Sequence, residues 1–389
     1  MSIPFFRLAA LYFAYFGFVG AFMPYFGLYL AWLGLAPWAI GSLLAVGQVT
    51  RVFAPNLWAW WADRRGRSID LLRWALALAV LSFAGLFVAR EYLTLLIVLA
   101  VHSFFVSAAM PLFESLTLGH LRGQYGRYGA IRLWGSVGFI VAVLLVGWAL
   151  DRIGIANLIW MVLLPIAAAA VFALAIYPAA APVHQDGEPI FAIVKRPEVV
   201  ALLSAGFLMC VAHGPLYVFY SIYLDQAGYS KTAVGALWSL GVIAEILVFL
   251  AMPHWLSRFT PRVILLASFG LATLRFLMIG WGVESLAVLI IAQVLHAASF
   301  GSFHAAALAV INHLFQGPRH VRGQALFSSL TYGAGSAVGS LLAGALWQSV
   351  GPQWTYTAAS LSAACGLLLV LWRGRALPRV GLSPSLPDE

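Results

Sequence analysis

Ionisable residues occur inside long hydrophobic runs of this sequence, and two of them flank one short basic segment. Glu114 precedes and Arg132 follows the segment at 122–127, which predicts two antiparallel helices with these side chains at similar depth. An unpaired charge at the centre of a bilayer costs about 2.5 to 3.5 kcal/mol on insertion scales, and charges there usually pair and face a polar cavity. We therefore expect Glu114 and Arg132 to point inward, where they could pair and bind a polar solute.

A second set of ionisable residues lies in the C-terminal part of the chain. Glu245 is the only acid inside a hydrophobic run there, and Arg275 and His296 lie in the next two runs. A carboxyl group in a low-dielectric site can take up or release a proton as an arginine approaches or leaves it. Glu245 is therefore the candidate proton carrier.

Two histidines share the run that follows Arg275. His296 and His304 lie about 80° apart around a helix at about 100° per residue, so both can approach one cavity. Without carboxylates or cysteines beside them they would make a poor metal site, and we expect no metal cofactor.

Composition places the chain among integral membrane proteins. Of its 389 residues, 63% are hydrophobic and 9% are charged, and the mean hydropathy is +0.94, whereas soluble domains carry about 25% charged residues. The first apolar run is too long and too aromatic for a cleavable signal peptide, so we expect none. Runs that could cross a hydrocarbon core of about 30 Å predict an all-α protein with twelve transmembrane helices, at about 7–34, 38–61, 71–89, 92–118, 129–150, 156–177, 199–224, 232–256, 262–282, 285–314, 322–348 and 353–372.

The formal net charge is +9, and its placement argues for a lipid bilayer and against nucleic acid as the partner. Most of the basic residues fall in the segments expected on one side of the membrane, while the other side holds Arg90, Arg152 and Lys231. The positive-inside rule then places both termini in the cytoplasm of a bacterial inner (plasma) membrane.

An internal repeat predicts two pseudo-symmetric six-helix bundles. The stretches "YLAWLGLAPWAIG" at 29–41 and "YLDQAGYSKTAVG" at 223–235 align without gaps, and the glycines at 138, 147 and 154 align with those at 335, 344 and 351. Parallel repeats of this kind are typical of two-bundle transporters with a site near the bilayer midplane. We expect an N-terminal bundle at 1–178, a cytoplasmic linker at 179–197, a C-terminal bundle at 198–375 and a cytoplasmic tail at 376–389.

The loop "AWWADRRGRS" at 59–68 resembles the signature loop of the major facilitator superfamily. Asp63, Arg64, Gly66 and Arg67 match the signature, while Ala59 stands for its leading glycine. The resemblance implies that the aspartate caps a helix or pairs with an arginine in one conformation, as a breakable latch on the cytoplasmic face. Alternatively, the arginines only fix the topology.

The stretch "RLWGSVGF" and the charges around it resemble the lactose permease branch of that superfamily. The resemblance implies that Glu114 and Arg132 hold the substrate and that Phe139 stacks on it. It also implies that Arg275 and His296 couple protons. The carboxylate expected three residues after the histidine is Ser299 here, which again leaves Glu245 as the candidate proton carrier.

Three longer stretches resemble the phenylpropionate permease family, whose members carry aromatic carboxylates with protons. They are "YGAIRLWGS", "AGYSKTAVGALWSLGVIAEILVF" and "QVLHAASFGSFHAAA". Three arginines and two acids within the spans give a positive cavity, and an arginine fork suits a carboxylate. We expect Tyr15, Tyr217, Trp238 and His304 to contribute to the same substrate site.

The repeat aligns Arg51 with Glu245, two residues of opposite charge. They could form a bridge between the halves that opens during transport, in which case Arg51 takes part in proton coupling. They could equally form a static pair that only satisfies burial. Both alternatives are open.

These residues predict a proton-coupled symporter that imports a small organic solute, an aromatic or other monocarboxylate, as a functional monomer without a cofactor. A neutral sugar or nucleoside is the main alternative, because a glutamate and arginine pair also binds hydroxyl groups. An efflux carrier and a membrane sensor that does not transport are further alternatives. The sequence holds none of the nucleotide-binding or hydrolase motifs that an enzyme would need.

Overall fold

The computed structural model describes residues 3–65, 68–121, 124–179 and 190–378. This part of the chain is helical throughout apart from short connections, and no strand occurs in it. Ten of its segments are long and apolar enough to cross a membrane. The predicted all-α membrane fold is therefore confirmed.

Eight helices form the first part of the described chain, and most are long apolar segments whose backbone hydrogen bonds are satisfied internally, as a lipid environment requires. They are α1 (Phe5–Phe22), α2 (Phe26–Trp32), α3 (Pro37–Arg65), α4 (Ser68–Ala84), α5 (Tyr92–Val106), α6 (Ala109–Leu121), α7 (Tyr128–Ile153) and α8 (Leu158–Leu174).

The second part of the described chain contains the remaining helices and two π-helical segments. The helices are α9 (Phe191–Val194), α10 (Pro197–Gln226), α11 (Lys231–Arg258), α12 (Pro261–Trp281), α13 (Leu286–His296), α14 (Ser302–Leu314), α15 (His320–Ser328) and α16 (Ser336–Arg373). The π-helical segments are Ala297–Gly301 and Ser329–Gly335.

The ten apolar segments in the described residues are consistent with the twelve predicted helices. One segment, His320–Arg373, is 54 residues long, and its last helix, α16, is broken at Gly351, where φ is 81°. Pro352 follows this glycine, so the break falls between the predicted spans at 322–348 and 353–372. Helix α3 occupies the predicted span at 38–61 but is less apolar and is not among the ten.

The chain forms two compact units, which we call unit 1 and unit 2. Unit 1 comprises Met1–His184, Gly214–Ser239 and Ser336–Gly351, and unit 2 comprises Gln185–His213, Leu240–Gly335 and Pro352–Glu389. Helices α10, α11 and α16 therefore each contribute to both. Residues 180–189 of the predicted linker at 179–197 lie outside the described residues. The predicted division into bundles stays a prediction.

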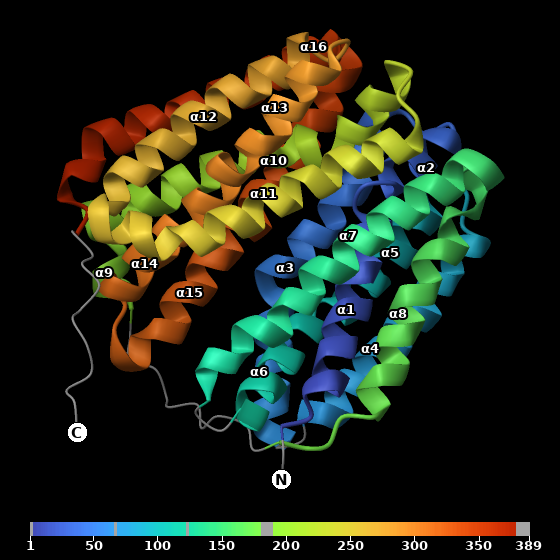
Figure 1. The fold of residues 1–389 in the computed structure, drawn as a ribbon, viewed down its shortest axis with the longest axis horizontal. Coiled ribbons are helices and arrows are strands. Elements are labelled where there is room, and N and C mark those ends of the chain that lie inside the picture. Colours follow the sequence, from blue (N-terminus) through green and yellow to red (C-terminus); the bar gives the residue numbers. More distant parts are fainter. Residues whose placement is uncertain (1–2, 66–67, 122–123, 180–189, 379–389) are drawn as a thin grey trace. The chain divides into compact units, whose positions relative to one another are not determined.

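Within unit 1, α1 packs closely on α7 and also on α8 (Figure 1). Two glycines make the close approach to α7 possible. A methyl group on Gly138 would meet the carbonyl oxygen of Phe13, and one on Gly20 would lie 2.5 Å from the carbonyl oxygen of Phe139. Small residues of this kind let the backbones of membrane helices touch.

Backbone conformation agrees with the predicted internal repeat. Gly154 and Gly351 align in the repeat, and each has φ of 81°. Gly34 and Gly228 align as well, with φ of 83° and 87°. A positive φ is a conformation that glycine adopts at little cost, so the same helix ends recur in both halves.

Within unit 2, α12 packs on α13, on α14 and on the π-helical segment between them. Such π-helical turns inside α-helices are frequent at functional sites. The segment Ala297–Gly301 joins α13 to α14 directly after His296, and Ser329–Gly335 joins α15 to α16.

Candidate functional site

The Glu114 carboxylate lies half-buried on α6 and is bound by a phenol. The hydroxyl of Tyr128, at the start of α7, donates a hydrogen bond of 3.1 Å to its Oε1. Tyr128 was not identified from the sequence, although it precedes Arg132 by four residues, so the two share one face of α7. That spacing could have identified it.

Arg132 lies against aromatic rings. Its guanidinium carbon is 4.2 Å from the ring centroid of Phe16 and 5.9 Å from that of Tyr12. These two rings of α1 are parallel within 5°, with centroids 6.4 Å apart. In this structure the Arg132 guanidinium thus packs on the ring of Phe16. The sequence suggested that it pairs with Glu114.

Tyr15 marks the point where charges from several helices converge. Its ring is buried and packs edge-on against Phe113 at 5.1 Å. Arg51, Glu114 and Arg132 lie in the neighbourhood of its hydroxyl. Helices α1, α3, α6 and α7 therefore bring two cations, one anion and several aromatic rings into one region of unit 1.

Of the other predicted aromatic residues of unit 1, Phe139 and Trp238 are buried and Tyr217 is half-buried. Phe139 is 6% exposed, and its backbone faces Gly20. Trp238 is 5% exposed, lies 6.3 Å from the ring of Tyr217 at 21°, and donates a hydrogen bond of 3.0 Å from Nε1 to Ser221 Oγ. Their part in substrate binding stays a prediction.

Arg275 and His296 both contact the π-helical segment Ala297–Gly301 of unit 2. Arg275 is 0% exposed and donates from Nε to the Ala292 carbonyl oxygen at 2.9 Å and from Nη1 to Ser299 Oγ at 3.4 Å. The ring of His296 stacks on Phe300 at 5.4 Å and 10°. Ser299, which stands where the lactose permease pattern expects a carboxylate, is therefore a neutral partner of the arginine.

Glu245 lies beside the π-helical segment that contains Ser299. A methyl group on Gly301 would lie 3.1 Å from Glu245 Cγ and 3.8 Å from its Oε1. Gly301 thus leaves space for this acid beside the segment that follows His296. Arg51 belongs to unit 1 and Glu245 to unit 2, so the predicted bridge between them stays a prediction.

His304 has a hydroxyl partner that sequence reasoning missed. Its Nδ1 lies 2.7 Å from the hydroxyl of Tyr332, in the π-helical segment Ser329–Gly335. The only sequence signal was the aromatic residue itself, because the contact joins helices that are far apart in the chain.

The predicted cytoplasmic latch is described only in part. Arg64 is exposed, and its guanidinium carbon is 4.2 Å from the ring centroid of Trp60. The side chain of Asp63 and the whole of Gly66 and Arg67 lie outside the described residues. The latch stays a prediction.

Long apolar helices, an internal repeat and ionisable side chains held among them define a membrane transporter of the two-bundle type. Residues 5–358 match the MFS_1 like family. The chain therefore belongs to this family of the major facilitator superfamily.

Relatives in the same superfamily cover most of the chain. It is 33% identical over 356 residues to a probable 3-phenylpropionic acid transporter of Escherichia coli, covering 88% of this chain and 91% of the relative. It is 31% identical to a maltose permease of Geobacillus stearothermophilus, over 66% of each.

A solved structure supports the fold. The crystal structure of the nucleoside transporter NupG superimposes with a TM-score of 0.83 at 17% identity, covering 96% of this chain and 99% of that one. These similar proteins are membrane transporters and not enzymes.

Proposed function

We propose that the protein is a proton-coupled symporter that imports an aromatic monocarboxylate by alternating access. The observation that carries this proposal is the position of Arg132 on the face of Phe16, with Tyr12 and Tyr15 beside it. An arginine fork binds a carboxylate through two parallel hydrogen bonds, and stacking on a ring holds the fork flat. The surrounding rings would pack against the aryl group of the same substrate.

Charge favours an anion in this region of unit 1. Arg51 and Arg132 supply two positive charges and Glu114 one negative charge, and Tyr128 already binds that carboxylate. A substrate carboxylate would balance the remaining positive charge. The relative described as a probable 3-phenylpropionic acid transporter supports the same class of substrate.

Proton coupling is assigned to unit 2. Glu245 lies beside Gly301. Arg275 lies on α12, which packs on the same π-helical segment, and His296 lies directly before that segment. In the proposed cycle, Glu245 carries the proton. His296 and Arg275 change the affinity of Glu245 for the proton as the π-helical segment moves. The proton gradient then supplies the energy for import. We place the protein in the bacterial inner membrane as a monomer with both termini in the cytoplasm.

A neutral polyhydroxyl solute is the second candidate. The Glu114 carboxylate and the Tyr128 hydroxyl form an acceptor and donor pair that suits sugar hydroxyl groups. The maltose permease relative and the nucleoside transporter structure favour this class.

Proton uptake into liposomes tests the two candidates against each other. Purified protein in liposomes with an internal pH dye would be given 3-phenylpropionate, its sulfonate analogue 2-phenylethanesulfonate, maltose and uridine. The sulfonate stays ionised and does not cross lipid as a neutral acid, so it removes the passive leak that a carboxylic acid causes. Protein-free liposomes and the Arg132→Ala variant are the controls.

Acidification by the aromatic anions that needs both the protein and Arg132 is the expected result. Acidification only with maltose or uridine would replace the proposal with the second candidate. Uptake of labelled aromatic acid without any proton movement would overturn the coupling alone.

A further inference from the structure

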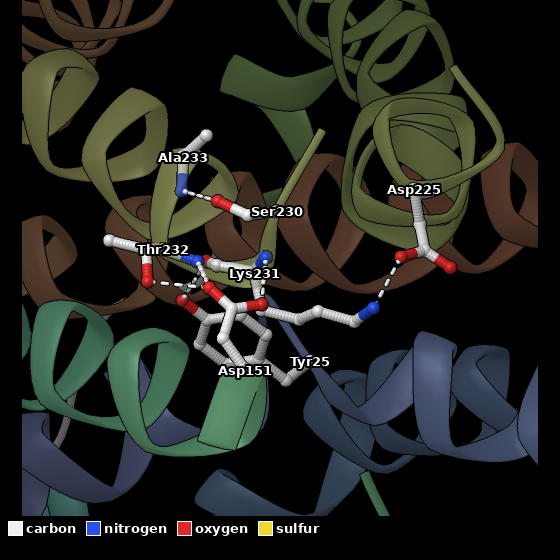
Figure 2. Close-up of polar contacts among 7 residues, drawn as sticks. All are labelled: Tyr25, Asp151, Asp225, Ser230, Lys231, Thr232 and Ala233. Carbon is white, nitrogen blue, oxygen red and sulfur yellow. Dashed lines mark hydrogen bonds and ion pairs between the residues drawn. The ribbon is translucent and has the colours of Figure 1, made fainter. Parts of the chain in front are cut away.

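Asp151, at the end of α7, is bound to the first residues of α11. Its Oδ1 accepts the Lys231 backbone N–H at 2.8 Å, and its Oδ2 accepts the Thr232 backbone N–H at 2.8 Å and the Thr232 hydroxyl at 2.6 Å (Figure 2). One carboxylate thus receives three hydrogen bonds. All of these residues belong to unit 1.

This contact is a helix cap supplied by another helix. The first N–H groups of a helix have no partner within it, and a carboxylate there also benefits from the positive end of the helix dipole. Caps usually come from the residue just before the helix. Such a cap is present here too, because Ser230 Oγ accepts the Ala233 N–H at 3.1 Å (Figure 2). Asp151 of α7 binds the two preceding N–H groups, so it ties the first half of the repeat to the second.

Tyr25 strengthens the same crossing. Its hydroxyl lies 3.2 Å from the Lys231 carbonyl oxygen of α11 (Figure 2). It also donates to the Val143 carbonyl oxygen of α7 at 2.7 Å. Gly147 and Gly235 make room for this hydroxyl, because a methyl group on either would meet it.

The repeat provides a second crossing, between α3 and α16, which lacks most of these bonds. Gly41 approaches Ser340 and Gly344 as Gly235 approaches Val143, but Gln348 stands in the place of Asp151. The Gln348 Oε1 accepts a single hydrogen bond, of 3.4 Å, from the Trp38 backbone N–H.

The Tyr25 hydroxyl of the α7 to α11 crossing also has no equivalent at the α3 to α16 crossing, where the aligned residue is a phenylalanine. Phe219 aligns with Tyr25, and it stacks on Trp347 at 4.4 Å and 13°. At the α7 to α11 crossing, Asp151 and Tyr25 therefore supply a charge and several hydrogen bonds. At the α3 to α16 crossing, the equivalent residues Gln348 and Phe219 supply one long hydrogen bond and one ring contact.

We propose that Asp151 is the releasable lock that holds α7 on α11 and so keeps this end of the transporter closed. Asp151 and Thr232 are exposed, so water can replace the three hydrogen bonds once the helices part. Transport by a two-bundle protein requires the halves of the repeat to separate at each end in turn. The lock would set how often this end opens, whichever substrate the protein carries.

Distance measurements between spin labels test the lock without any substrate. The full chain, with Cys210 and Cys365 replaced by alanine, would carry labels at Ile153 and Ala227, which are exposed near the crossing. Double electron–electron resonance in lipid nanodiscs then reports the populations in which these positions are near and far.

Asp151→Ala should raise the ratio of far to near populations by about fivefold, the effect expected for loss of a helix cap. Gln348→Ala is the matched control at the second crossing and should leave the distribution unchanged. An unchanged distribution in Asp151→Ala would overturn the proposal, and so would equal shifts in both variants, because they would indicate general loosening.

Thr232→Val serves if Asp151→Ala does not fold. It removes one of the three hydrogen bonds and keeps both backbone contacts, so the shift should go in the same direction and be smaller. No shift in Thr232→Val, in the absence of a folded Asp151→Ala, would also overturn the lock.

Discussion

Tyr128 donates a hydrogen bond to Glu114 across the connection between α6 and α7, and the arginine one turn further along α7 lies on an aromatic ring instead. The Glu114 carboxylate, which the sequence suggested as the partner of Arg132, is therefore hydrogen bonded to the Tyr128 hydroxyl. This arrangement keeps the guanidinium available for another anion. Tyr128 is therefore a residue that positions Glu114, and its loss should lower the affinity for substrate.

Replacing Tyr128 by phenylalanine should weaken binding of an aromatic carboxylate by about tenfold. The freed Glu114 carboxylate would draw Arg132 away from Phe16 and compete with the substrate for it, and a hydrogen bond to a charged group is worth about 1.5 to 3 kcal/mol. Isothermal titration with 3-phenylpropionate measures the change.

The double variant Tyr128→Phe with Glu114→Gln provides the control for this interpretation. It removes the competing charge, so affinity should return to within about twofold of the wild type, a non-additive result expected for residues in contact. Additive losses in the double variant would contradict the competition.

Arg132→Lys should lose most of the affinity for an aromatic carboxylate although it keeps the positive charge. Lysine has no planar fork to stack on Phe16 and to bind two oxygens together, so a loss of about tenfold or more is expected.

Phe16→Leu should cost less, about two- to fivefold, because a cation–π contact is worth about 0.5 to 1 kcal/mol. The same titration ranks the two variants, and equal affinity of Arg132→Lys and wild type would exclude bidentate binding.

Gly138→Ala should destabilise the protein because the added methyl group would meet the Phe13 carbonyl oxygen and force α1 from α7. Overpacking of this kind costs roughly 1 to 3 kcal/mol. Gly129→Ala on the same helix is the matched control, since nothing lies within 4 Å of its added methyl group. Thermal unfolding in detergent should show a lower Tm only for Gly138→Ala. Equal Tm values would mean that the α1 to α7 contact relaxes at no cost.

The sequence predicted the membrane spans and the helix ends, because the residues within each of these segments determine them. Apolar runs indicate spans because a bilayer requires long apolar helices, and the aligned glycines at 154 and 351 indicate equivalent helix ends because both adopt a positive φ. The span at α3 shows the limit of hydropathy, since its charged residues lower the apolarity of a helix that the structure nevertheless forms.

The partners of the site residues could not be predicted in the same way. Glu114 has Tyr128 and Arg132 on one face of α7, and only the folded geometry selects between them. The sequence shows Asp151 only as an acid at the end of a helix. Its partners in α11 are distant in the chain, so the sequence does not indicate them. The π-helical segment beside Glu245 depends on packing rather than on a residue pattern.

Glu245→Gln should abolish uphill accumulation of substrate while leaving exchange intact. Glutamine keeps the volume that Gly301 accommodates but cannot release a proton, so the loaded carrier could still cycle in both directions without being driven by the gradient. Proteoliposomes measure both properties, with uptake against an imposed pH gradient for accumulation and with counterflow of labelled substrate for exchange. Glu284→Gln is the matched control, because Glu284 is exposed between α12 and α13 and outside the candidate spans. Accumulation at the wild-type level in Glu245→Gln would move the proton carrier to Glu114 or to the histidines, whereas loss of both accumulation and exchange would mean that Glu245 is needed for the conformational cycle itself.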